Sequence, residues 1–251
     1  MYLPPSQLLS VTHRVLQIVP KADRALIEAV RQDLAAAADQ ERAKAMQAYM
    51  KSQMPYRGVS APLQRSILRP VFNADRLDQR QWRNAVLQLW REARYREERY
   101  AAIELTGHRY YAEFQNLSML SVYEEMIVSG AWWDFVDTVA IHRVGGLLLR
   151  KYPKALTRRL MSWSRSSDLW KRRSAIIAQV SFKTETDLDL LYYCIENNLG
   201  DREFFIKKAI GWALRSYSWV DPKEVERYVK ERSENLSSLS KREALKRVRK
   251  G

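Results

Sequence analysis

The residue types best suited to chemistry gather in one short segment, residues 132–137 (WWDFVD), which follows Gly130. Trp133 and Asp137 are four residues apart, so on a helix their ring and carboxylate would share one face about a turn from each other. A simpler interpretation is open as well. Acidic residues near a helix start, such as Asp134 and Asp137, complement the helix dipole, and paired tryptophans usually belong to a core.

Basic and aromatic residues recur in two later segments, residues 170–175 (WKRRSA) and 207–212 (KKAIGW). If corresponding helices line one groove, four side chains converge on a single patch: Trp133, Asp137, Arg173 and Trp212. That patch would hold a carboxylate between two aromatic faces, with an arginine that binds a phosphate. A carboxylate repels a nucleic-acid backbone, so its presence in a basic groove suggests that it stabilises a developing positive charge.

Other reactive clusters are not apparent in the sequence. There is no phosphate-binding loop, no GxSxG motif and no cysteine–histidine cluster. The three histidines, His13, His108 and His142, are too far apart to suggest a metal site or a triad. Any reaction must therefore depend on carboxylates, aromatic rings and cations, and we expect no metal.

Charge and composition indicate an intracellular protein with acidic partners. Lys and Arg number 43 against 29 Asp and Glu, which gives a net charge of +14. Nucleic acid is the first partner to consider and an anionic membrane surface the second, with a merely soluble surface as the simpler alternative. The single cysteine, Cys194, fits a reducing compartment. No apolar run approaches the ~20 residues that span a bilayer, and residues 1–19 do not resemble a signal peptide. We expect a cytoplasmic, nucleoid-associated protein.

Helix signals recur along the chain and predict an all-α fold. Apolar spacing and helix-forming residues predict helices over Ser6–Val19, Asp23–Ala38 and Asp39–Met54. Further helices should begin near Pro62, Asp78, Arg94, Asn116, Trp132, Pro153, Ser167, Thr186, Asp201, Asp221 and Ser238, most of them at a capping residue. No convincing strand is predicted.

A repeat emerges when the helices are aligned on an alanine that is flanked by charge and followed by an aliphatic residue. The aligned positions are Ala102, Ala140, Ala175, Ala209 and Ala244, with spacings of 38, 35, 34 and 35 residues. This period is typical of two-helix repeats such as HEAT or armadillo. We therefore predict a single domain, residues 1–251, in which residues 1–40 form capping helices. Residues 41–251 would form an α-solenoid with a concave basic groove.

Five stretches of the chain resemble the AlkD-type DNA alkylation repair glycosylases, which are built from HEAT-like repeats. They are AYMKSQMPYRGVSAP (48–62), GAWWDFVDTVA (130–140), DLWKRRSAIIAQ (168–179), REFFIKKAIGWALRSY (202–217) and LSKREALKRV (239–248). The resemblance covers roughly residues 40 to 250. The WWDxVD and FFIxKAIGWxLR segments carry most of its specificity.

The resemblance implies roles for particular residues. Trp133, Asp137 and Trp212 match the active-site aromatic and acid positions. The positions expected to contact DNA are Arg173 (with Arg172 as the alternative), Tyr49, Arg215, Lys207 and Lys208. Ser60 and Ser181 depart from the family pattern, which has a longer polar side chain and a lysine there, so two groove contacts are in doubt.

The activity implied by the resemblance is hydrolysis of the N-glycosidic bond to cationic alkylated purines in double-stranded DNA. Such an enzyme would act as a monomer, without a cofactor and without flipping the base, so bulky adducts could be accepted. Two alternatives stay open. One is a non-catalytic module that binds DNA or structured RNA, and the other is a protein-interaction scaffold, which the net charge of +14 disfavours.

Overall fold

Aspartates start many of the helices, as local capping rules require. In the computed structural model, which describes residues 22–248, five aspartate side chains accept a hydrogen bond from the backbone N–H three residues on. These caps are Asp39, Asp78, Asp168, Asp187 and Asp221. No strand occurs within the described residues. The predicted all-α class is confirmed.

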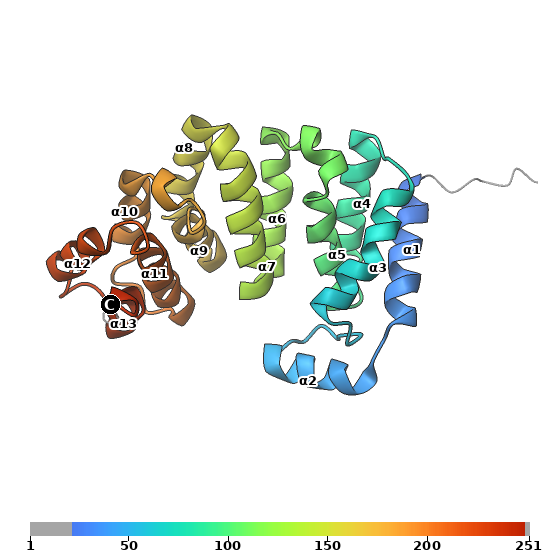
Figure 1. The fold of residues 1–251 in the computed structure, drawn as a ribbon, viewed down its shortest axis with the longest axis horizontal. Helices are drawn as coiled ribbons and strands as arrows, with labels where there is room; N and C mark the ends of the chain where they lie inside the picture. The colour runs from blue at the N-terminus through green and yellow to red at the C-terminus, as the bar shows by residue number, and fades with distance from the viewer. Residues whose placement is uncertain (1–21, 249–251) are drawn as a thin grey trace, which may run out of the picture.

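The helices form a stack that runs from α1 to α13 in chain order (Figure 1). Their bounds are α1 (Ala22–Ala36), α2 (Gln40–Met50), α3 (Ala61–Ala74), α4 (Gln79–Arg91), α5 (Arg96–Thr106), α6 (Leu120–Gly130), α7 (Trp133–Thr138), α8 (Pro153–Trp163), α9 (Leu169–Ile177), α10 (Leu188–Glu196), α11 (Phe204–Tyr217), α12 (Pro222–Glu231) and α13 (Ser238–Ala244). Short 3₁₀ segments are η1 (Arg109–Phe114), η2 (Leu117–Met119) and η4 (Lys183–Glu185). Helix α7 continues as the π-helical segment η3 (Val139–Leu149).

One row of helices runs from α5 to α13. Helix α5 packs on α7, α7 on α9, α9 on α11, and α11 on α13. The five periodic alanines lie in successive members of this row, with Ala140 in η3, and all five are buried. A small side chain at this position allows neighbouring helices to approach closely. The alanine period in the sequence therefore corresponds to a repeated packing position of a helical solenoid.

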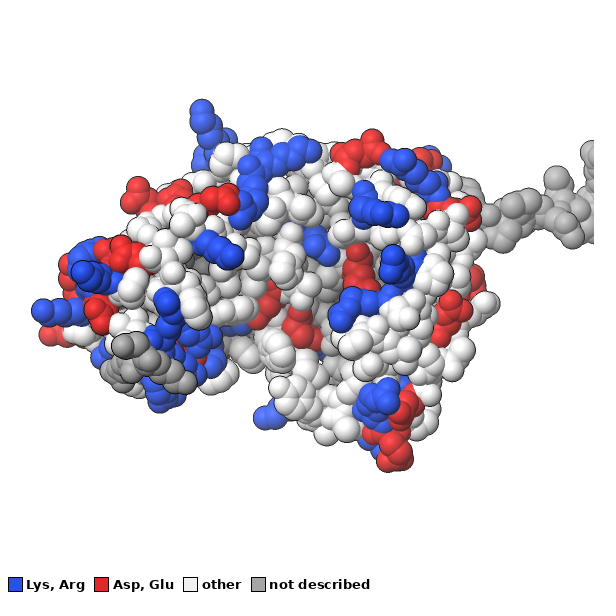
Figure 2. Space-filling model, viewed as in Figure 1, with Lys and Arg blue, Asp and Glu red and all other residues white. Residues whose placement is uncertain are grey.

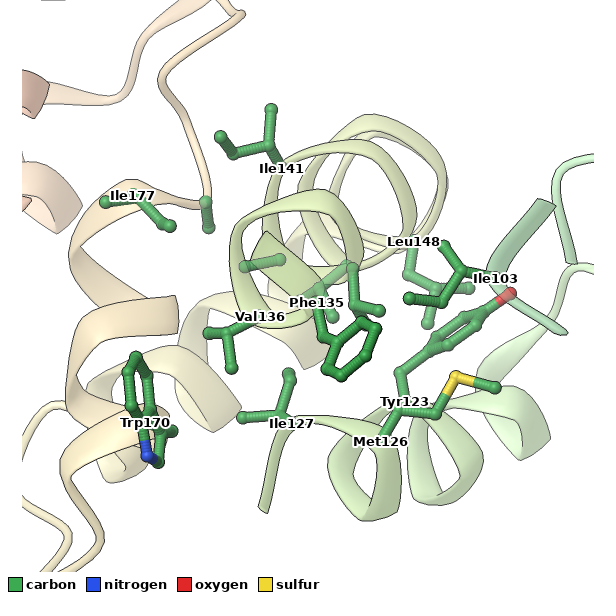
Figure 3. Packing of buried hydrophobic residues seen from close by; sticks show 14 of the residues in the cluster. Ile103, Tyr123, Met126, Ile127, Phe135, Val136, Ile141, Leu148, Trp170 and Ile177 are labelled. Atoms are coloured by element: carbon green, nitrogen blue, oxygen red, sulfur yellow. The ribbon is translucent and has the colours of Figure 1, made fainter. Parts of the chain in front are cut away.

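Helix α7 is fixed in the middle of this row by two fully buried residues, Phe135 and Val136. Figure 3 shows them beside Ile127 of α6, with Trp170 and Ile177 of α9 on the far side of Val136. Because Phe135 and Val136 point into the core, the carboxylates at positions 134 and 137 must emerge elsewhere on the helix.

Helix α2 lies across the lower edge of the stack in Figure 1. It packs through Ala43 and Met50, which form a small second core with Tyr56, and Trp132 and Trp133 contact this core. The lower edge of the molecule is notched between α2 and the end that contains α11 and α13 (Figure 2). Basic and acidic side chains are mixed on the face shown there, so the predicted basic groove stays a prediction.

The two helices predicted at the N-terminal end have different outcomes. The helix predicted over residues 6–19 lies outside the described residues. Helix α1 corresponds to the helix predicted over residues 23–38, and it packs against α3, α4 and α5 at one end of the stack. Among the described residues, no helix combines the length and apolar character needed to cross a bilayer.

Candidate active site

The start of α7 is set by a sharp change of direction after α6. Ala131 adopts a left-handed conformation (φ 41°, ψ 36°), and Trp132 is extended and precedes the first helical residue. A side chain at Gly130 would place its Cβ 3.1 Å from the ring of Trp90, so the turn packs directly on α4. This turn holds Asp134 and Asp137 at fixed positions between α5 and α9.

Asp137 forms a buried, bidentate ion pair with Arg173 of α9. The Nε and Nη2 atoms of Arg173 each donate to one carboxylate oxygen, both at 2.7 Å, and its Nη1 donates to the Phe205 carbonyl at 2.6 Å. The Asp137 and Arg173 side chains are 14% and 6% exposed. Burial raises the pKa of Asp137 above its usual range, while the hydrogen bonds and charge of Arg173 act to lower it. Arg173 therefore favours the ionised carboxylate in a site that otherwise disfavours charge.

A second buried ion pair lies one turn away on α7. Nη2 of Arg96, at the start of α5, donates to both oxygens of Asp134 at 2.7 and 2.6 Å. The hydroxyl of Tyr100 donates to the same carboxylate at 2.5 Å, and Tyr56 and Tyr100 share a further hydrogen bond of 3.0 Å. Arg96 also lies over the Phe135 ring, 4.1 Å from its centroid. Asp134 thus accepts three hydrogen bonds from side chains of α5 and ties α7 to that helix.

Sequence reasoning missed Arg96 and Tyr100 as partners of this site. A signal for the pairing was present: Arg96 stands six residues before Ala102, and Asp134 stands six residues before Ala140. The two residues therefore occupy the same position in successive repeats. Equivalent positions of neighbouring repeats lie side by side in a solenoid.

The candidate tryptophans occupy neighbouring elements but do not all touch the ion pair. Trp133 is partly buried and contacts the small core beneath α2. Trp212 is partly buried on α11, the helix whose Phe205 carbonyl binds Arg173. The structure thus brings Asp137 and Arg173 into direct contact and places the two tryptophans on the helices that carry or contact this pair. Convergence of all four side chains around a ligand stays a prediction.

Some of the residues predicted to bind DNA are exposed, whereas others already form hydrogen bonds and ion pairs within the protein. Tyr49 on α2 is 78% exposed. Arg172 is bound to Asp201 and to the carbonyls of Ser166 and Ser167, so it links α9 to the segment before α11. Arg172 and Arg173, neighbours in sequence, therefore contact different parts of the fold.

On α11, two of the three residues predicted to contact DNA bind one acidic residue of α13. Arg215 and Lys208 lie 2.6 and 3.2 Å from the carboxylate of Glu243. Lys207 is partly buried and has no ion pair within residues 22–248. Gly211 allows this arrangement, because a Cβ there would lie 2.4 Å from the Cβ of Glu243.

The loop that contains Ser60 is organised by a carboxylate that sequence reasoning also missed. Glu97 is fully buried and accepts hydrogen bonds from the backbone N–H groups of Arg57, Gly58 and Val59. Gly58 has φ +85°, and a Cβ there would meet the Asp39 carbonyl at 2.0 Å, so only glycine fits. Ser60 precedes α3 and makes no side-chain capping bond. Glu97 thus holds the connection between α2 and α3.

These features define a class: a helical-repeat protein with a largely buried carboxylate that an arginine of the neighbouring helix holds. The family model described as DNA alkylation repair enzyme matches residues 30–248, so the chain belongs to this family. Among solved structures, the chain is similar to one described as a predicted DNA alkylation repair enzyme from Enterococcus faecalis. The two are 29% identical with a TM-score of 0.77, over 85% of this chain and 98% of that one. A search of curated proteins finds no significant match.

Proposed function

We propose that this protein is a DNA glycosylase that hydrolyses the N-glycosidic bond of cationic alkylated purines in double-stranded DNA. Membership of a DNA alkylation repair family supports action on alkylated DNA. The candidate substrates are 7-methylguanine, 3-methyladenine and, if the base is not drawn into a pocket, bulkier adducts. The observation that carries the proposal is the largely buried Asp137 carboxylate, which a single arginine holds near the end of α7.

The proposed reaction needs a negative charge more than it needs a proton donor. An alkylated purine of this kind already bears a positive charge, so it departs as a neutral base with the electron pair of the glycosidic bond. Positive charge then develops on the deoxyribose, and a water molecule adds to C1′ and loses a proton. A charge preorganised in a buried site is an effective catalyst for such a step. Asp137 is proposed to supply that charge and to orient the water.

Arg173 is proposed to act mainly as a positioning residue. It uses three of its five N–H donors on Asp137 and on the Phe205 carbonyl, and it is 5% exposed. The phosphate contact expected from the sequence would use the two remaining donors. Arg173 would then link the carboxylate to the DNA backbone beside the lesion.

The aromatic and basic residues complete the proposed DNA interface. The rings of Trp133 and Trp212 would face the deoxyribose, where a ring face attracts developing positive charge. Tyr49, with its exposed ring, and Lys207 would contact the backbone. No cluster of three or more metal-ligating side chains occurs in the part of the chain that the structure describes.

A non-catalytic DNA- or RNA-binding module is the second candidate. The observation that favours it is that Arg173 already neutralises Asp137 in this structure. A module of this kind would use the basic residues for binding and the ion pair for stability alone.

Base release separates the two candidates. Purified protein is incubated with methylated duplex DNA in the presence of EDTA, which removes metal ions. Released bases are identified by chromatography and mass spectrometry. We expect 7-methylguanine or 3-methyladenine from the wild type and a greatly reduced yield from Asp137→Asn. Retained duplex binding with no released base would favour the binding module.

A further inference from the structure

The most exposed tryptophan of the described chain lies outside the candidate active site. Trp219 follows the end of α11 and is 70% exposed. The guanidinium of Arg247 is stacked on its ring, 3.7 Å from the centroid, and also donates to the Ser218 carbonyl. The two contacts hold a cation and an aromatic ring together at the surface.

Trp219 borders two cavities. One, of about 900 Å³, is lined by four cations and a single carboxylate: Arg215, Lys223, Lys246, Arg247 and Glu226. The other, of about 760 Å³, is lined mainly by small and polar residues, among them Ser181, Thr184, Ser216 and Lys183. Arg247 lines only the first cavity, so the ring separates a strongly basic hollow from a polar one.

The basic hollow is preorganised by the packing of α13 on α11. Glu243 is nearly fully buried and contacts Lys208, Arg215 and Lys246 at 3.2, 2.6 and 2.6 Å. One carboxylate thus holds three ammonium or guanidinium groups in place without neutralising them all. Four cations line the cavity against the carboxylates of Glu226, which also lines it, and Glu243, which pairs with Arg215 and Lys246, so a net charge of +2 remains. An anionic ligand fits this balance.

We propose that Trp219 and this basic hollow bind an unpaired nucleotide of DNA. The base stacks on the Trp219 ring beside the polar cavity, and the adjoining phosphate is bound by Arg247 and Lys246. An aromatic platform next to a cationic track is the usual arrangement for single-stranded nucleic acid. A base inside a duplex offers no ring face for stacking, which distinguishes this site from the Asp137 site. The inference rests on the DNA-binding part of the proposed function.

Binding is measured by fluorescence anisotropy with a labelled oligothymidylate of about 12 nucleotides and with a blunt, undamaged duplex of equal length. We expect Trp219→Ala to weaken binding of the oligothymidylate about tenfold and to leave duplex affinity nearly unchanged. Trp219→Phe keeps a ring and should keep most of the affinity. Arg247→Ala should reduce the salt slope for the single strand by about 0.7, the value for one phosphate contact.

The matched control is Arg76→Ala, because Arg76 also lies against an aromatic ring, 6.0 Å from the Tyr110 centroid, and is 65% exposed. Arg76 closely follows α3, which lies near the other end of the stack (Figure 1). This variant should change neither affinity. Equal affinity of wild type and Trp219→Ala for the single strand would overturn the proposal. So would an equal loss on single strand and blunt duplex, which would indicate a duplex contact. The assay uses undamaged DNA, so a failure of base excision would count against the glycosylase and leave this result standing.

Discussion

Helix α7 carries two carboxylates, three residues apart, and each is held by a buried arginine from a different neighbouring helix. Asp134 accepts from Arg96 with both oxygens and from the Tyr100 hydroxyl as well. Asp137 accepts one hydrogen bond on each oxygen, both from Arg173, among the described residues. Both pairs join an aspartate of α7 to an arginine of a neighbouring helix, and the side chains of the two pairs are buried to nearly the same extent. Asp134 accepts three hydrogen bonds from protein groups and Asp137 two, and a carboxylate accepts about four, so Asp137 keeps more accepting capacity for a ligand or water.

The largest expected effect separates the two carboxylates by catalysis. Asp137→Asn should slow single-turnover release of 7-methylguanine by about 100-fold or more, because the charge that stabilises the sugar cation is lost. Asp134→Asn should change that rate little, since its oxygens are occupied by Arg96 and Tyr100. Both rates are measured well below the melting temperature of each variant. Normal excision by Asp137→Asn would remove this residue from the mechanism.

The two ion pairs can also be compared by their contribution to the free energy of unfolding. Arg96→Met leaves Asp134 buried with only Tyr100 as a partner, and breaking a buried pair from one side typically costs about 3–5 kcal/mol of unfolding free energy. Replacing both partners, in Arg96→Met with Asp134→Leu, should recover most of that loss. Urea denaturation measures both.

For the other pair, Arg173→Met with Asp137→Leu should likewise recover stability but not excision. Recovery of excision in this double variant would show that Asp137 is only structural. The pairing with Arg173 also means that Asp137→Asn has a larger stability cost than a simple helix-dipole charge would have.

The pH dependence of excision tests the role proposed for Asp137 and its pairing with Arg173. Asp137 must be ionised to act, and burial raises its pKa, so the acidic limb of the rate should lie above the ordinary range of an aspartate. Removing Arg173 removes the effect that lowers this pKa, so Arg173→Met should move the limb to still higher pH. Excision rates in the wild type and Arg173→Met, measured from acid to neutral pH, test the shift. A limb that moves to lower pH would contradict the assigned ion pair.

The smallest expected effects concern the basic residues of the proposed DNA interface. Some of them, such as Lys208, already form an ion pair with a carboxylate, whereas Lys207 forms none within the described residues. Wild-type affinity for duplex DNA should fall with salt with a log–log slope between about −4 and −7, as four to eight phosphate contacts require. Lys207→Ala should reduce that slope by about 0.9. Lys208→Ala should reduce it less, because its ammonium is shared with Glu243. A flat salt dependence in the wild type would contradict DNA binding altogether.

The sequence determined what depends on short-range physics. Capping aspartates such as Asp78 and Asp221 fixed helix starts, because a side chain only has to reach its own first turn. The alanine period located a buried position of each second helix, because close packing tolerates only a small side chain there. The family motifs already pointed to alkylation repair.

The tertiary structure decided which charge meets which. Arg172 and Arg173 are adjacent in sequence, yet one binds Asp201 and the other Asp137, because successive side chains on a helix point about 100° apart. Glu97 and Gly58 meet across 39 residues of chain to shape the α2–α3 connection. Nothing local to either sequence segment specifies such a partner. Ion pairs and backbone anchors depend on distances that exist only after the helices have packed.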